Sequence, residues 1–407
     1  MFYKRINKHL KIIKKLLPVV VVLLLVLILL SSCSIKEEKD PLVVELKQRI
    51  DDGQAYLFRM YEPGINGIHK FYYAEEDRLE ERVHTIYTSS SVYTLMKLYD
   101  YSGEDHLWQQ ALKSGEFILS MQETDPESRR YGAFSYSYFL DPLEREEKYV
   151  VGTTSKTIFT LLELYRRTQD EKYLISAKAG ADWLLTMIRD DGSMTPHSIL
   201  REDGKWYRAT KESHLFNGQV LSALSRVYRV TKDDKYLTGA QKIAGRFEWW
   251  IGEEGCYLYD DYRSKNPISS SWAIMALSDF YLASGRKDIR QIVFDCSDEL
   301  ILKQLEEGRW QDSYTTSGTG WIGEVLMEIY KICEADDMNY CERFTDPVKK
   351  ALPWLFARTF DESNSGDLPN PQRAHGGLYW NHQNKYVRTD SVAHGMNAYI
   401  DLMMVLK

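Results

Sequence analysis

The sequence lacks the short motifs that mark several common enzyme classes. No G-x-x-x-x-G-K-[ST], G-x-S-x-G or H-E-x-x-H pattern occurs among its 407 residues. The first pattern cradles nucleotide phosphates, the second presents a serine nucleophile, and the third holds a catalytic zinc ion. The sequence therefore gives no support to a nucleotide-binding, serine-hydrolase or zinc-protease function.

Cysteine is also scarce, with five residues in the chain. None of them forms a C-x-x-C or mixed Cys/His pattern, so we predict neither a structural metal nor any other cofactor. The four cysteines beyond the N-terminal region are Cys256, Cys296, Cys333 and Cys341. In an oxidising compartment Cys333 and Cys341 would make the shortest disulfide, and free buried thiols are equally compatible with the sequence.

Acidic residues are missing from positions 1–32, which carry six Lys or Arg and an apolar run from Leu16 to Leu30. The run is shorter than the ~20 residues that span a bilayer. A basic start, an apolar run and small residues are typical of a secretory signal. The letters LSSC, ending at Cys33, resemble a bacterial lipobox. We therefore predict a signal peptide over residues 1–32, acylation of Cys33 and a charged tether over residues 33–40; an uncleaved anchor helix is the alternative.

Basic residues are outnumbered in the rest of the chain. Removing residues 1–32 takes away six positive charges and moves the formal net charge from −7 to −13. Nucleic-acid binding needs a basic face, so we expect no nucleic-acid partner. An acidic surface is typical of a solvated exported protein, and the predicted location is the periplasm or cell exterior, anchored to a membrane through Cys33.

One helical pattern occurs six times in the remaining sequence. YTSSSVYTLMKLY at residues 87–99 opens with small polar residues and continues for about three helical turns with few charges. Related segments occupy residues 152–165, 215–228, 268–281, 317–330 and, more weakly, 389–403. Four of the segments are followed by a turn containing Gly or Asp and then by a more amphipathic helix. The repeating unit is therefore a helical hairpin.

The spacing of the hairpins predicts the fold class. They recur at roughly 50 to 70 residues, which exceeds the periods of tetratricopeptide and HEAT repeats. We predict an all-α fold, a single (α/α)6 toroid over residues 41–407, in which nearly apolar inner helices are surrounded by amphipathic outer helices. The sixth inner helix needs an outer partner. We expect residues 42–61 to supply it, so that the two ends of the chain close the ring.

The repeats also carry a resemblance to a known superfamily. TQDEKYLISAKAGADWLLTM and TKDDKYLTGAQKIAGRF, together with the alternation of inner and outer helices, resemble the six-hairpin glycosidase superfamily. That group includes unsaturated glucuronyl hydrolases, N-acylglucosamine 2-epimerases and the toroids of several polysaccharide lyases. The resemblance extends over nearly the whole chain after the leader and implies a toroid. It matches no single family's catalytic motif, so it assigns no residue a role.

Aromatic residues gather in the loops between the hairpins, as in EEGCYLYDDY, EEGRWQDSY and HGGLYWNHQNKY. Aromatic faces stack on sugars while the tips of Tyr and Trp form hydrogen bonds, although many of these rings would simply pack the loops onto the helix ends. Acidic residues recur in the same loops. A rim of aromatic rings and carboxylates predicts a glycan as substrate or ligand.

The sharpest local pattern lies at the start of the sixth inner helix. Asp390 and His394 are four residues apart and share a helix face, and Arg388 precedes them. We interpret Asp390 as a catalytic acid or base, His394 as a substrate ligand or proton carrier, and Arg388 as a clamp for a sugar carboxylate. In the alternative interpretation Asp390 only caps the helix and His394 is a buried, hydrogen-bonded residue.

Other residues complete the predicted site. Asp312 and Glu212, which lies near His214, are candidates for a second catalytic acid, as are the adjacent Asp260 and Asp261. The predicted substrate-binding residues besides Arg388 are Arg82, His84, Asp261, Trp310, Trp380, His382 and Tyr386. Each of these also has a structural interpretation as part of a solvated turn, a helix cap or a packed loop.

These patterns predict a carbohydrate-active enzyme, foremost a glycoside hydrolase that acts by paired carboxylates on an oligosaccharide or polysaccharide, including one with uronic acids. Two alternatives stay open. One is an epimerase or polysaccharide lyase, in which His or Tyr takes a proton next to a carboxylate. The other is a surface lipoprotein that binds a glycan without catalysis.

Overall fold

The computed structural model describes residues 40–406. The predicted signal peptide, the predicted acylation site Cys33 and the tether up to residue 39 lie outside the described residues. Between residues 40 and 406, no helix combines the length and the apolar character needed to cross a bilayer.

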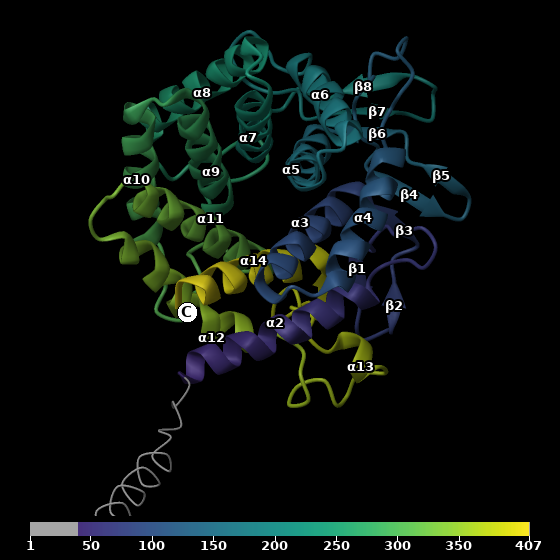
Figure 1. Ribbon diagram of the computed structural model, residues 1–407, viewed down its shortest axis with the longest axis vertical. Coiled ribbons are helices and arrows are strands. Elements are labelled where there is room, and N and C mark those ends of the chain that lie inside the picture. Colours follow the sequence, from purple (N-terminus) through teal and green to yellow (C-terminus); the bar gives the residue numbers. More distant parts are fainter. Residues whose placement is uncertain (1–39, 407) are drawn as a thin grey trace, which may run out of the picture. The chain divides into compact units, whose positions relative to one another are not determined.

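The six inner helices have the positions that the repeats predict. They are α3 (Thr85–Ser102), α5 (Val151–Thr168), α7 (His214–Thr231), α9 (Pro267–Ser284), α11 (Thr316–Ala335) and α14 (Thr389–Leu406). Each packs against the next in this order, and α14 packs against α3, so the ring is closed (Figure 1). The fold is therefore the predicted (α/α)6 toroid.

Small residues at the start of each repeat let the inner helices approach closely. The hydroxyl oxygens of Ser89 and Thr157 lie 3.0 Å apart between α3 and α5. A Cβ atom added to Gly218 would lie 2.7 Å from the carbonyl oxygen of Trp272, and one added to Gly320 would lie 2.8 Å from the backbone nitrogen of Gly395. Larger side chains at these positions would push the inner helices apart.

The outer helices of the first five hairpins are α4 (Asp105–Ser120), α6 (Glu171–Leu185), α8 (Asp234–Glu254), α10 (Lys287–Ile301) and α12 (Thr345–Phe356). The turns that precede them follow from local chemistry. Asp170 and Asp233 cap α6 and α8 through their side-chain oxygens. Gly103 and Gly285 end α3 and α9 in the left-handed conformation, at φ values of 73° and 72°. These residues make α4, α6, α8 and α10 turn back along their inner helices.

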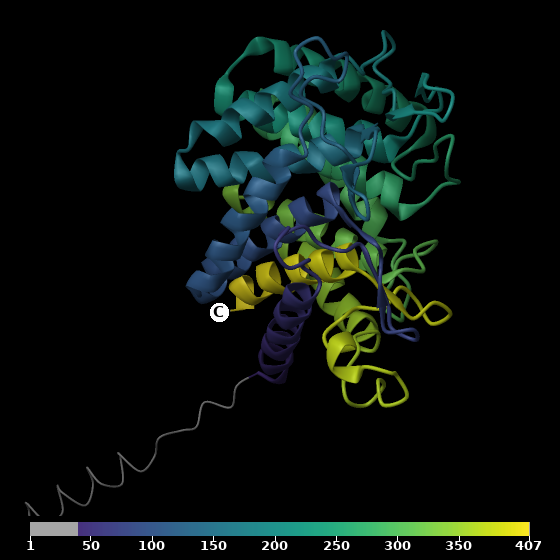
Figure 2. The same ribbon diagram turned by 90° about the vertical axis from the view of Figure 1, so that its right-hand side faces the viewer.

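The two ends of the toroid meet at the sixth hairpin. Helix α2 (Pro41–Arg59) lies against α14 (Figure 2). The approach is close: a Cβ atom added to Gly53 of α2 would lie 2.6 Å from the sulfur of Met396 of α14. A strand pair reinforces the closure, with Phe71 opposite Arg388 in antiparallel register. Helix α2 is thus the outer partner that we expected residues 42–61 to provide.

The loops contain short antiparallel strands that the sequence pattern does not predict. They are β1 (Phe71–Tyr73), β2 (Arg78–Leu79), β3 (Arg82–His84), β4 (Ser137–Leu140), β5 (Leu143–Arg145), β6 (Lys148–Val150), β7 (His197–Leu200), β8 (Trp206–Arg208) and β9 (Tyr386–Arg388). They form three sheets in the orders β2-β1-β9, β3-β4-β5 and β6-β7-β8. Strands β3, β6 and β9 run directly into α3, α5 and α14, so strand pairing fixes where these helices begin.

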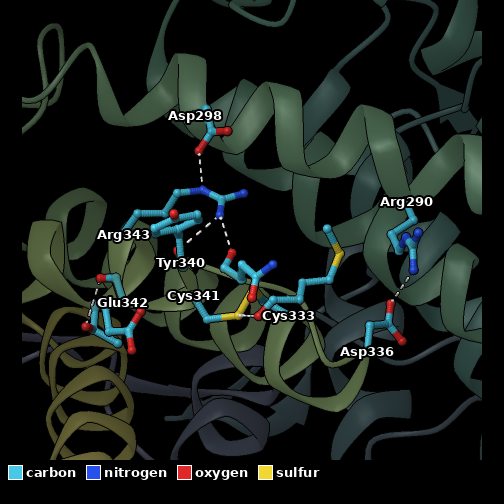
Figure 3. The surroundings of a disulfide bond; sticks show 11 residues. Arg290, Asp298, Cys333, Asp336, Tyr340, Cys341, Glu342 and Arg343 are labelled. Atoms are coloured by element: carbon cyan, nitrogen blue, oxygen red, sulfur yellow. Dashed lines mark hydrogen bonds and ion pairs between the residues drawn. A yellow bond between two sulfur atoms is a disulfide. The ribbon is translucent and has the colours of Figure 1, made fainter.

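Two disulfides link neighbouring elements. Cys256 bonds to Cys296 of α10, and Cys333 of α11 bonds to Cys341 of the 3-10 helix η1 (Cys341–Phe344). Figure 3 shows the second bond beside Arg343, whose guanidinium donates to Asp298 at 3.0 Å. The pair predicted as the shortest closure is therefore formed, and the other two cysteines of this region are paired as well.

Candidate functional site

A cavity of about 540 Å³ lies at the N-terminal ends of the inner helices. Its volume is within the range of small-molecule sites. Each of the six inner helices contributes at least two residues from its first two turns, and these include a pair three or four positions apart: Tyr87 and Ser90, Thr153 and Lys156, Phe216 and Gln219, Ile268 and Trp272, Ser317 and Trp321, Asp390 and His394. We call this space the front cavity. Arg388 and Trp380 also line it, so four of the predicted residues come together here.

Asp390 is held in a tight polar cluster. The Arg388 guanidinium donates to both of its carboxylate oxygens, at 2.6 Å from Nε and 2.5 Å from Nη2, and Ser317 donates to it at 3.2 Å. Trp380 lies under the same guanidinium, 4.1 Å from ring centroid to Cζ. Burial raises the pKa of Asp390, but the charge of Arg388 outweighs it and holds this pKa below its ordinary value. Asp390 is therefore an ionised carboxylate at neutral pH, suited to a base rather than an acid.

The pairing with Asp390 also bears on the clamp role predicted for Arg388. A bidentate pair uses the face of the guanidinium that would otherwise receive a sugar carboxylate. The carboxylate that Arg388 binds in this structure belongs to the protein itself.

His394 forms a second polar pair at the floor of the cavity. Its Nδ1 lies 2.6 Å from Glu324 Oε2, and Asn397 donates to the other oxygen of Glu324 at 3.0 Å. Burial raises the pKa of Glu324, yet His394, Lys156 and Lys97 together lower this pKa to about 2. The ionised carboxylate accepts a hydrogen bond from Nδ1–H, so in a neutral ring the lone pair lies on Nε2. In this orientation Nε2 is the ring atom that can accept a proton or a hydrogen bond.

A lysine and two tryptophans form the wall beside this pair. The rings of Trp272 and Trp321 stack with centroids 3.9 Å apart, and Lys156 Nζ lies 5.4 and 5.2 Å from those centroids. Burial lowers the pKa of Lys156 below its ordinary value. Within residues 40–406, no carboxylate approaches its ammonium within 4.0 Å. The wall therefore combines a flat aromatic surface with an unpaired positive charge.

Several predicted residues lie away from the front cavity. Trp310 is completely buried, and its indole nitrogen donates to the carbonyl of Leu300 at 3.1 Å, so it belongs to the core and offers no face to a ligand. His84 is buried with its Nε2 3.1 Å from Glu80, and burial lowers its pKa. Arg82 pairs with Glu80 at 2.8 Å and lines a separate hollow of about 340 Å³.

The acids that we considered as partners of Asp390 are also elsewhere. Glu212 forms an ion pair with Arg246 at 2.8 Å, and its backbone nitrogen donates to Asp261 at 2.7 Å. Asp260 accepts from the backbone of His214 at 2.9 Å. These contacts are caps and braces of the loops before α7 and α9. Asp312 is exposed outside the cavity lining.

The last two predicted residues, Tyr386 and His382, contact neighbouring side chains of the loop and helix end near the cavity. Tyr386 stacks on Trp380 with centroids 5.8 Å apart, and His382 contacts the guanidinium of Arg358 through Nε2. Neither side chain lines the front cavity. In the part of the chain that the structure describes, no group of three or more His, Cys, Asp or Glu residues could hold a metal ion.

Sequence reasoning missed Lys156, Glu324, Trp272 and Trp321, although the repeats contain a signal for three of them. When 14-residue segments are aligned on their last residue, Tyr99 in the first and Met403 in the sixth, the fifth positions are Ser90, Lys156, Gln219, Trp272, Trp321 and His394. All six residues line the front cavity. The fifth position of the repeat differs in chemistry from copy to copy, and in all six copies it lines the cavity.

Comparison with known proteins adds the fold relationship. No protein-family model and no curated protein matches the chain. Among solved structures, the cellobiose 2-epimerase of Bacillus thermoamylovorans B4167 matches with a TM-score of 0.68 and 13% identity, over 89% of this chain and 98% of that one. A D-mannose isomerase matches with a TM-score of 0.65 and 12% identity, over 90% and 100%.

A glycoside hydrolase shares the architecture as well. The α-1,6-mannanase GH76A of Salegentibacter sp. HEL1_6 matches with a TM-score of 0.62 and 13% identity, over 89% of this chain and 100% of that one. At these identities the likeness establishes the fold, which is the six-hairpin toroid that this chain shares with an epimerase, an isomerase and a mannanase.

Proposed function

We propose that this protein is a sugar epimerase or isomerase that moves a proton at a carbon next to a carbonyl or carboxyl group, with His394 as the base. The observation that carries the proposal is the His394–Glu324 pair at the floor of the front cavity. The ionised Glu324 orients the ring and stabilises the imidazolium that forms when Nε2 takes a proton. The fold shared with a cellobiose 2-epimerase and a D-mannose isomerase supports the same chemistry.

The other residues of the cavity fit a sugar. Trp272 and Trp321 offer an aromatic wall for the face of the ring. Burial raises the pKa of the Tyr87 and Tyr136 hydroxyls, so both phenols are neutral hydrogen-bonding groups. A neutral phenol can donate to a sugar oxygen on which charge develops.

A glycoside hydrolase is the second candidate, because Asp390 places a carboxylate in the cavity and a mannanase shares the fold. Hydrolysis by paired carboxylates needs two acids about 5 to 10 Å apart. Among the described residues, Asp390 is the one acid in the cavity lining. The geometry therefore supports proton transfer by His394 better than hydrolysis.

Deuterium exchange distinguishes the two reactions. The purified protein is incubated in D2O with cellobiose, mannose and glucuronate in turn, and also with oligosaccharides of mannose and of uronic acids. An epimerase or isomerase incorporates deuterium at the reacting carbon, visible by NMR, and His394→Asn loses this exchange. Release of new reducing ends without deuterium incorporation would contradict the proposal and favour the hydrolase.

We also propose that the protein works outside the cytoplasm, attached to a membrane through Cys33. The two disulfides support this location, because disulfides persist in oxidising compartments. Labelling of cells with a palmitate analogue should mark the wild type and leave Cys33→Ala unlabelled; equal labelling of both proteins would contradict the anchor.

A further inference from the structure

The cations of the front cavity differ in whether the protein itself neutralises them. Arg388 forms a bidentate pair with Asp390, and Arg263 lies 3.6 Å from Asp260. Lys156 has no such partner within 4.0 Å in the described part of the chain. Lys156 is therefore the cation of the front cavity that no described carboxylate contacts directly, although the charge of Glu324 acts on it from a greater distance.

Aromatic rings surround the ammonium of Lys156, but no carboxylate of the described residues forms a direct ion pair with it. Its ammonium makes no hydrogen bond to the described residues and lies among the rings of Phe159, Trp272 and Trp321. A partly buried charge without a direct ion-pair partner adds little to the stability of the fold. At the equivalent positions of the other repeats stand Ser, Gln, Trp, Trp and His, so the fold does not require a lysine.

The surroundings favour an anionic group on a sugar. The first turns of all six inner helices face the front cavity, and the dipoles of these helices add a positive potential there. The stacked Trp272 and Trp321 beside the ammonium provide an aromatic face for a pyranose ring. The cavity thus offers a flat apolar surface and a single positive charge next to each other.

We propose that the front cavity binds a uronic acid, and that Lys156 pairs with its carboxylate. The proposal takes the sugar class from the proposed function and adds the charged substituent. A carboxylate carries one negative charge, which matches the one unpaired cation. A phosphate ester carries close to two charges at neutral pH and would leave one of them without a partner.

Binding measurements with a catalytically silent protein test the proposal. In the His394→Asn background, glucuronate and galacturonate are titrated by calorimetry at pH 7 against glucose and galactose. We expect both uronates to bind at least tenfold more tightly than their neutral counterparts. Adding Lys156→Met should abolish this preference, while Lys156→Arg should retain part of it, because a cation is preserved.

A matched control separates the local charge from the overall charge. Lys178 is exposed on α6, so Lys178→Met removes the same charge far from the cavity and should leave the preference intact. Equal affinity for acidic and neutral sugars, or an equal loss in both Met variants, would overturn the proposal. Equally tight binding of glucose 6-sulfate would overturn the assignment to a carboxylate.

The proposed function can fail independently of this inference. The wild type could exchange no deuterium on any sugar and still prefer uronates through Lys156. In that case the proposed epimerase or isomerase reaction is wrong, and the proposed ligand class is upheld. If exchange occurs on neutral sugars and uronates bind no better, the ligand class is wrong and the reaction stands.

Discussion

Charged side chains lie at both ends of the inner ring of helices. They form direct ion pairs at one end, whereas at the other end one lysine has none in the described part of the chain. In the front cavity, Lys156 has no close counterion among residues 40–406. At the C-terminal halves of the same helices, the charges are paired directly: Lys97 with Asp401 at 2.7 Å, Lys331 with Asp401 at 3.0 Å and with Glu328 at 2.7 Å, and Arg226 with Asp279 at 2.9 Å. We call this second group the rear charge network.

The partly buried Lys97 and Lys156 illustrate this difference. Burial alone lowers the pKa of both Lys97 and Lys156. At Lys97 the charges of Asp401 and Glu328 outweigh burial, so its pKa lies above the ordinary value. At Lys156 burial dominates, and the pKa lies below it. The ion pairs of the rear charge network stabilise the fold, whereas Lys156 in the front cavity has no direct ion pair with the described residues and can bind an anionic ligand.

We expect the largest effect from a substitution in the front cavity, and we expect it on catalytic activity. Replacing His394 with Asn removes the proton acceptor, and general base catalysis contributes about 10²- to 10⁴-fold to rates. We expect deuterium exchange by His394→Asn to fall by at least about 100-fold. The rates of both proteins at saturating sugar provide the measurement, and retention of more than a tenth of the wild-type rate would remove His394 from the chemistry.

The next effect is expected at the rear, on stability. Arg226→Met leaves the buried Asp279 without its cation, which costs about 3 to 5 kcal/mol of unfolding free energy. Urea unfolding should detect this loss. The double variant Arg226→Met with Asp279→Leu removes both charges and should recover most of it; a double variant as unstable as the single one would show that packing rather than charge is responsible.

The contribution of Glu324 to stability at low pH is a further prediction. This carboxylate links the two ends of the ring, because it interacts with both Lys156 and Lys97. Its pKa is about 2 in the folded protein against an ordinary value of 4.5. The stability from this shift is present above pH 4.5 and is lost as the pH falls toward 2. We expect Glu324→Gln to lose less unfolding free energy than the wild type over that interval, and parallel curves would contradict the depressed pKa.

The fold was predictable from the sequence because each inner helix repeats one local pattern. The position of α2 followed from counting hairpins. The short strands β1 to β9 were not predictable, since two to four residues show no alternating pattern. The sheets that they form depend on pairing between distant segments, as between Phe71 and Arg388.

The site was only partly predictable, because its chemistry depends on contacts between repeats. Asp390 and His394 share a helix face, and the sequence shows this directly. The partners Ser317 and Glu324 lie about 70 residues away and enter through ring closure. The same limit explains Trp310, whose loop is rich in aromatic residues like the others but whose ring packs into the core.

The smallest effect is expected when the unpaired lysine is removed. Lys156→Met keeps the length of the side chain and removes a partly buried charge that no close acid compensates, so the unfolding free energy should stay the same or rise by up to about 1 kcal/mol. Urea unfolding should compare this variant with Arg226→Met, because each variant removes one partly buried positive charge from the inner ring. A loss of about 3 kcal/mol or more in Lys156→Met would mean that the front is paired as tightly as the rear, and the distinction between the two ends would fail. Unchanged stability together with lost affinity for uronates would instead identify Lys156 as a residue kept for its ligand.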